Sequence, residues 1–192
     1  DLNLNNFDTS NLFFGVEQVS NDTYLRVFGP YMSNAASKYG NASSMNNEVT
    51  LTLSNGNYNF TSGLNIYENL RITKNSDRYQ YILPHYSFDT VLGDKFFDGS
   101  ISFSSSGSNN LNNTNNLISD VTNNINYTST SYISNFGFRN NYNLYFKNNN
   151  SVGRKSSTKS SPEIDFVGLF EANSSLPLIK KHTNYKNYLT PK

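Results

Sequence analysis

The feature that most constrains the fold is a two-residue alternation of apolar and polar side chains. In EVTLTL (48–53), valine and two leucines alternate with glutamate and threonines. Side chains of a strand point alternately to its two faces, so this pattern predicts a half-buried strand. Asn55-Gly56 follows at once and predicts a tight hairpin, with Tyr58 and Phe60 on the return strand.

Similar patterns predict strands along most of the chain. Asp98-Gly99 marks a second turn, and a hairpin is expected around 139–141. In 164–171 both alternating sets are largely apolar, which predicts a strand buried on both faces. The other predicted strands are 12–19, 23–28, 64–72, 78–83, 85–92, 100–103, 132–138 and 142–147.

Two segments have a helical pattern. Residues 31–40 end in glycine and predict a short helix. In the asparagine-rich tract, Leu111, Ile118, Val121 and Ile125 recur at the spacing of one helix face, and Thr114 is a candidate N-cap. We therefore expect 114–126 to form a helix that packs against a sheet, with its asparagines facing water.

The chain is long enough for one domain with a sizeable core. We predict a β-rich α+β fold of mainly antiparallel sheet with one helix packed against the sheet. Residues 1–147 are expected to form the core, 148–162 a flexible basic loop, and 163–192 the final strand and C-terminal tail of the same domain.

Neutral polar side chains replace charged ones. The chain has 34 asparagines, and its charged fraction of 15% lies below the ~25% usual in soluble domains. The absence of cysteine excludes disulfides, thiolate metal ligands and a cysteine nucleophile. No apolar run is long enough for a membrane helix, so we expect no membrane insertion.

The titratable residues form no catalytic or metal pattern. Neither His85 nor His182 has a neighbouring carboxylate placed to orient it, as a serine-type triad would need. The close carboxylates of GDKFFDG (93–99) and PEID (162–165) do not match a calcium loop. We expect no enzyme activity, no metal and no cofactor.

The C-terminal region is basic, with Lys180, Lys181 and Lys186 close to Tyr185 and Tyr188. Nucleic-acid binding calls for a denser basic face with stacking aromatic rings. The sequence pI is only about 8.0, so we expect no nucleic-acid partner.

Tyrosines next to arginine, aspartate and amide groups are typical of sugar sites, where a ring stacks on the sugar and polar groups bind its hydroxyls. A β-domain without tryptophan also fills its core with Tyr and Phe, so most of these rings have a packing explanation. KNSDRYQY (74–81) mixes both types at a loop-to-strand junction. Its predicted ligand-binding residues are Asp77, Arg78, Tyr79 and Tyr81.

The cysteine-free, Asn-, Ser- and Tyr-rich composition, the length of about 190 residues and the terminal Lys192 resemble the trypsin-released spike head (the VP8* part) of rotaviruses. The chain lacks the tryptophan-bearing signature of the common groups, so a divergent, group B-like head is the closer comparison. The resemblance implies glycan recognition at a host-cell surface and a location on the virion surface or otherwise outside the cell.

The sequence therefore predicts a glycan-binding attachment domain of a virion spike, whose partners are host-cell glycans and other domains of the same spike. Weak, shallow binding would be strengthened by many copies on one particle. A bacterial or protist surface adhesin and a structural coat domain without ligand are the alternatives. A glycosidase would need two facing carboxylates in a cleft.

Overall fold

A computed structural model of the chain describes residues 1–28, 43–72, 78–156, 159–181 and 186–189. Its main element is one nine-stranded sheet in the order β1-β2-β3-β4-β5-β6-β8, with β7 and β9 both paired to β8. All neighbours are antiparallel. The strands are β1 (Thr9–Gly15), β2 (Ser44–Asn55), β3 (Tyr58–Asn69), β4 (Tyr79–Phe96), β5 (Gly99–Asn112), β6 (Asn116–Ser129), β7 (Tyr132–Ile133), β8 (Arg139–Arg154) and β9 (Glu163–Ser175).

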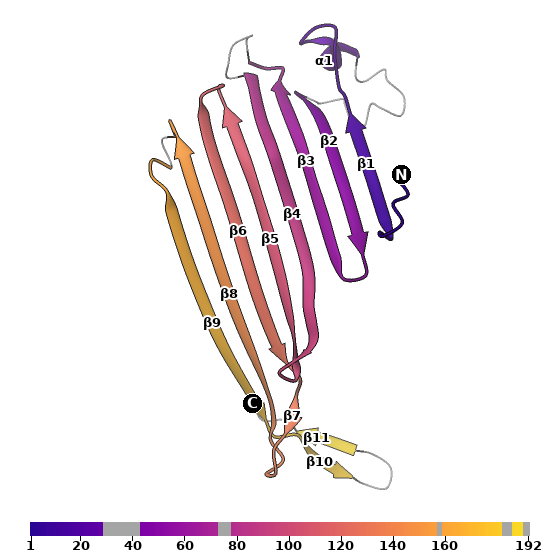
Figure 1. Ribbon diagram of the computed structural model, residues 1–192, viewed down its shortest axis with the longest axis vertical. Coiled ribbons are helices and arrows are strands. Elements are labelled where there is room, and N and C mark those ends of the chain that lie inside the picture. The colour runs from indigo at the N-terminus through magenta and orange to yellow at the C-terminus, as the bar shows by residue number, and fades with distance from the viewer. Residues whose placement is uncertain (29–42, 73–77, 157–158, 182–185, 190–192) are drawn as a thin grey trace.

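The sheet is a single curved layer (Figure 1). Each strand contacts its sheet neighbours rather than a second layer. A one-turn helix, α1 (Tyr24–Phe28), lies at the upper end beside β1 and β2, and a separate hairpin of β10 (Leu178–Lys181) and β11 (Lys186–Leu189) lies at the lower end.

The buried core is correspondingly small. Met45 and Leu70 form the hydrophobic cluster of the described residues, with Val19 and Tyr24 packed against it at the upper end. The chain exposes 13552 Å², whereas a compact monomer of 21.7 kDa exposes about 9,200 Å² by the usual size scaling. The excess arises because the sheet presents both of its faces.

The two faces differ in chemistry. Directly paired residues of neighbouring strands lie on the same face, so the register assigns each side chain to one of them. We call one of them the apolar face. It carries Leu12, Phe14, Val49, Leu51, Leu53, Tyr58, Phe60, Tyr86, Phe88, Ile101, Phe103, Val121, Ile125, Tyr127, Leu144, Phe146, Ile164, Phe166 and Phe170.

The opposite face, here the polar face, is lined by threonine, serine, asparagine and acidic residues. Apolar side chains on this face include Phe13 on β1 and Val167 and Leu169 on β9 at the sheet edges, and Ile82 on β4 and Ile118 on β6 within the sheet. Its polar members include Glu48, Thr50, Thr52, Asn59, Asp89, Ser102, Ser104, Asp120, Thr122, Asn124, Asn126, Lys147, Asn149, Asp165 and Glu171.

The predicted β-rich, mainly antiparallel character is confirmed, and the Asn55-Gly56 hairpin forms with Asn55 paired to Tyr58. The helix predicted for 114–126 is wrong, because Asn116–Ser129 is strand β6. Asn113 and Thr114 have φ values of 53° and 57° and reverse the chain between β5 and β6. The predicted N-cap is therefore part of a hairpin turn, and asparagine tolerates that left-handed conformation well.

The strand predicted for 23–28 is wrong, because Tyr24–Phe28 is helix α1. The hairpin turn predicted at 139–141 is also wrong, because β8 begins at Arg139 and the chain turns at 134–138.

Other predictions differ from the structure in part or lie outside it. The predicted flexible loop 148–162 begins too early, because β8 continues to Arg154. The segment 164–171 is a strand, but it lies at the sheet edge, where both of its faces are exposed instead of buried. The helix predicted for 31–40 falls outside the described residues.

The turn before β5 yields a stability prediction. A Cβ added at Gly99 would lie 2.5 Å from the carbonyl oxygen of Thr128 and 2.8 Å from the Cα of Ser129. Gly99→Ala is therefore expected to lower the free energy of unfolding by about 1–3 kcal/mol in a denaturant titration. Gly56→Ala is the control, because no atom lies within 4 Å of its added Cβ; equal losses in the two variants would contradict the packing argument.

Candidate functional site

The apolar residues form a band that extends across the sheet. On β8 the apolar face changes from Leu144 and Phe146 in the lower part to Asn148 in the upper part. Leu53 on β2 and Phe166 on β9 both lie in the cross-strand row of Asn148, so the apolar surface reaches the same row on both sides of the sheet. Ring contacts connect it laterally, with centroids 6.2 Å apart for Tyr58–Phe88 and 6.3 Å for Phe88–Phe103.

Tyrosines mark both borders of this apolar band. Tyr127 and Tyr142 lie at its lower border, where the hydroxyl groups of Tyr142 and Tyr132 are 2.7 Å apart. Tyr79 and Tyr81 lie at the upper end of β4, with ring centroids 6.3 Å apart. A tyrosine presents an apolar ring and a polar hydroxyl, so it suits a boundary between apolar and aqueous surroundings.

Charged side chains avoid the band. In β2, β3, β5, β6, β8 and β9, the charged residues of the apolar face are Glu68 and Arg154, both at the upper end. The charged residues of these strands otherwise lie on the polar face. The sheet therefore separates an uncharged apolar surface from a charged and polar one.

A ladder of amides and hydroxyls interrupts the apolar face on β5, β6 and β8, between Phe88 and Phe166 of the same cross-strand row. The Ser105 hydroxyl donates to Asn123 Oδ1 at 2.8 Å, and Asn123 Nδ2 donates to Asn148 Oδ1 at 3.3 Å. Tyr86 joins the ladder, because its hydroxyl lies 3.1 Å from the Ser105 hydroxyl. These mutual hydrogen bonds satisfy polar groups that adjoin an apolar surface.

The structure places Arg78, one of the predicted ligand residues, in the interior at 3% exposure. Its guanidinium donates to both carboxylate oxygens of Asp22 at 2.7 and 2.9 Å and to Glu68 Oε1 at 2.6 Å. The hydrogen bonds that Arg78 donates to Asp22 first, and then to Glu68, raise the pKa of Arg78 despite its burial. Arg78 therefore joins the segment before α1 to β3 and β4.

Tyr79 and Tyr81 are half-buried beside this ion-pair cluster. The Tyr79 hydroxyl donates to Glu68 Oε1 at 3.2 Å, and this hydrogen bond raises the pKa of the phenol. Asp77 lies outside the described residues. The structure thus brings Arg78, Tyr79 and Tyr81 together, and their role in ligand binding stays a prediction.

A separate polar pocket lies on the polar face, where the tip of the β2–β3 hairpin meets β4. The Asn57 carbonyl accepts hydrogen bonds from the Thr90 hydroxyl at 3.0 Å and from the Val91 amide at 3.2 Å, which holds the tip in place. β4, β5 and β6 continue beyond the tip of the hairpin. The space between the tip and these strands is an open pocket of ≈ 290 Å³. The pocket is lined by Gly56, Asn57, Tyr58, Asn59, Asp89, Thr90, Val91, Ser102, Phe103, Ser104 and Asn126.

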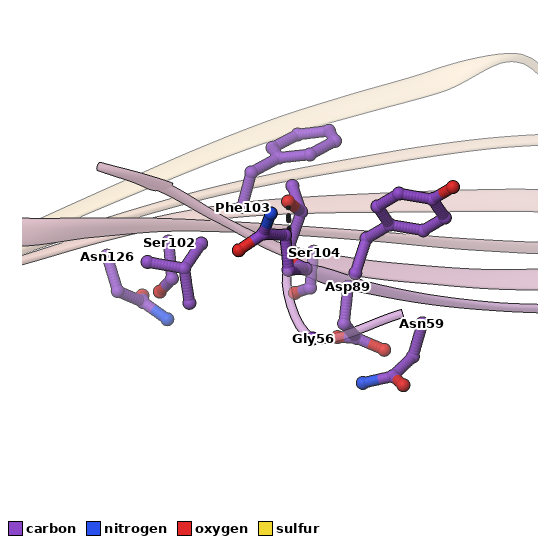
Figure 2. A pocket seen from close by; sticks show the side chains of 11 residues that line it. Gly56, Asn59, Asp89, Ser102, Phe103, Ser104 and Asn126 are labelled. Carbon is purple, nitrogen blue, oxygen red and sulfur yellow. Dashed lines mark hydrogen bonds between the residues drawn. The ribbon is translucent and has the colours of Figure 1, made fainter. Parts of the chain in front are cut away.

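Figure 2 shows Asn59, Asp89 and Asn126 on one side of the sheet and Phe103 on the other. One carboxylate and two amides therefore face the same open space, as groups that bind hydroxyls or water do. The sequence analysis did not single out these residues. They come from different strands, and the cross-strand register that unites them has no local signal.

Among the residues that the structure describes, no cluster of His, Cys, Asp and Glu is suited to hold a metal ion. No helix in the described ranges combines the length and apolar character needed to cross a membrane. Comparisons with protein-family models and with curated proteins gave no match to this sequence.

Proposed function

We propose that the chain is a wall segment of a membrane-embedded sheet, with its apolar face against lipid acyl chains and its polar face toward water. The observation that carries this proposal is the charge-free apolar band across a single-layer sheet. It differs from the sequence-based expectation of no membrane insertion, which considered only long apolar helices.

The strand lengths are compatible with lipid as the covering material. Strands that cross a bilayer tilt by about 45° and need about 9–11 residues. The long strands have the required length, from 12 residues in β2 to 18 in β4. Tyrosines at the borders of the band suit a boundary between acyl chains and water.

The proposal is tested by flotation of the refolded 192-residue chain with phosphatidylcholine vesicles. We expect the chain to float with the vesicles and to stay with them after a wash in 1 M salt, since hydrophobic contact is not screened. A chain that stays folded and monodisperse in buffer and sediments away from the vesicles would contradict it. A stable dimer that excludes lipid would show that a second copy covers the apolar face.

Carbohydrate binding on the polar face is a second candidate function. The pocket at the hairpin tip supports it, because Asn59, Asp89 and Asn126 converge there with two serine hydroxyls. The resemblance to rotavirus spike heads adds the prediction that such binding occurs on a virion surface or otherwise outside the cell. A surface adhesin would use the same chemistry.

Asp89→Ala is expected to reduce glycan binding at least about tenfold, because a charge-assisted hydrogen bond contributes about 1.5–3 kcal/mol. The measurement is a glycan array with the chain displayed in many copies. Asp120→Ala is the matched control, because Asp120 is a carboxylate of the polar face outside the pocket. Equal binding by the wild type and both variants, or none by the wild type, would remove this candidate.

A further inference from the structure

We propose that the outer edge of β9 binds an additional antiparallel strand that carries basic side chains on the polar face. β9 pairs with β8 through thirteen consecutive residues from Glu163 to Ser175 without a register shift. Among the described residues, no strand pairs with its other edge. Every second residue of β9 therefore directs its amide and carbonyl outward.

This edge lacks the features that keep natural edge strands apart. It is long and regular, it contains no proline or lysine, and twelve of its thirteen residues are exposed. Short length, bulges, prolines and lysines are the usual means by which proteins prevent unwanted pairing. Their absence indicates an edge that is used.

The exposed side chains of β9 determine which side chains a pairing strand would need on each face. Ile164, Phe166 and Phe170 lie on the apolar face and are about two-thirds exposed, at 64%, 65% and 64%. A strand with apolar residues at alternate positions would extend the apolar band by one strand.

On the polar face β9 is acidic. Glu163, Asp165 and Glu171 lie there, and Lys159 forms an ion pair with Glu163. Asn143 Nδ2 donates a hydrogen bond to Glu171 Oε2 at 3.1 Å. Lysine or arginine opposite Asp165 and Glu171 would form favourable cross-strand pairs.

The same charges disfavour the β9 strand of a second copy as partner. Antiparallel pairing centred on Gly168 would set Asp165 of each copy opposite Glu171 of the other, which is unfavourable. The inference does not depend on lipid, because an unpaired edge and its charges are present in any surroundings.

The test uses the full 192-residue chain in detergent micelles and two synthetic peptides. One peptide has the sequence TVKVTVTVKVT, and the other has glutamate in place of both lysines. We expect the lysine peptide to slow hydrogen exchange of residues 163–175 at least about tenfold, and the glutamate peptide to leave it unchanged. The double variant Asp165→Lys/Glu171→Lys should reverse this preference.

Equal protection by both peptides, or by neither, would overturn the proposal. Protection of β9 without peptide, with a dimer in solution, would identify a second copy as the occupant and would also overturn it. Loss of vesicle flotation with the peptide preference intact would reject only the lipid proposal.

Discussion

Phe146→Lys is expected to abolish stable association of the chain with phosphatidylcholine vesicles. Phe146 lies within the apolar band, is 41% exposed and has its ring centroid 5.8 Å from that of Phe166. Placing a lysine at a lipid-facing position near the bilayer centre costs about 2–4 kcal/mol. We therefore expect the partition coefficient in a flotation assay to fall at least about thirtyfold.

Tyr145→Lys is the matched control for this prediction. Tyr145 is the preceding residue on β8, it is 37% exposed and it lies on the polar face. The two variants remove an aromatic ring and add a lysine at neighbouring positions that point in opposite directions. If both variants lost vesicle binding equally, or both retained it equally, the two faces of the sheet would not differ in their contact with lipid.

Arg78→Ala is expected to destabilise the upper end of the sheet by about 2–3 kcal/mol. The guanidinium is buried, and its removal leaves Glu68 and Asp22 without their shared cation. We place the effect below that of a fully buried pair because the side chains of Glu68 and Asp22 are 23% and 37% exposed. Hydrogen exchange of residues 66–69 and 79–82 measures the loss, because it reports local opening.

Arg71→Ala is the control, because Arg71 is exposed and lies in the same part of the chain. A surface change of this kind is expected to stay within about 0.5 kcal/mol. Arg78→Lys should give an intermediate loss, since lysine keeps the charge but cannot donate to Asp22 and Glu68 in the same geometry. If Arg78→Ala left local exchange unchanged, the ion-pair cluster would not stabilise this region.

Local sequence signals predicted strands and turns well where each strand shows its own alternation. The strand at 48–53 and the Asn55-Gly56 turn follow from neighbouring residues alone. The sequence of β6 resembles a helix because Asn123 occupies an apolar-face position between Val121 and Ile125 and hides the alternation. Asn123 is satisfied there by Ser105 and Asn148 on the two neighbouring strands, which one segment cannot reveal.

The exposure of β9 had no local signal either. Two apolar faces predict burial only if both faces and both edges have neighbours, and that depends on the rest of the sheet. The candidate sites also depend on contacts between segments that lie far apart in the sequence. Arg78 looked like a ligand residue in its loop context, but its partner Asp22 lies 56 positions away in the sequence. The pocket around Asp89 exists only because three strands continue beyond a hairpin tip.

The central claim is that the two faces of the sheet meet different surroundings. The chain has no cysteine, so single cysteines at positions 144 to 147 of β8 can each carry a nitroxide label. In vesicles we expect accessibility to lipid-soluble oxygen to be high at 144 and 146, and accessibility to a water-soluble nickel reagent to be high at 145 and 147. Uniform accessibility to the water-soluble reagent at all four positions would contradict the account.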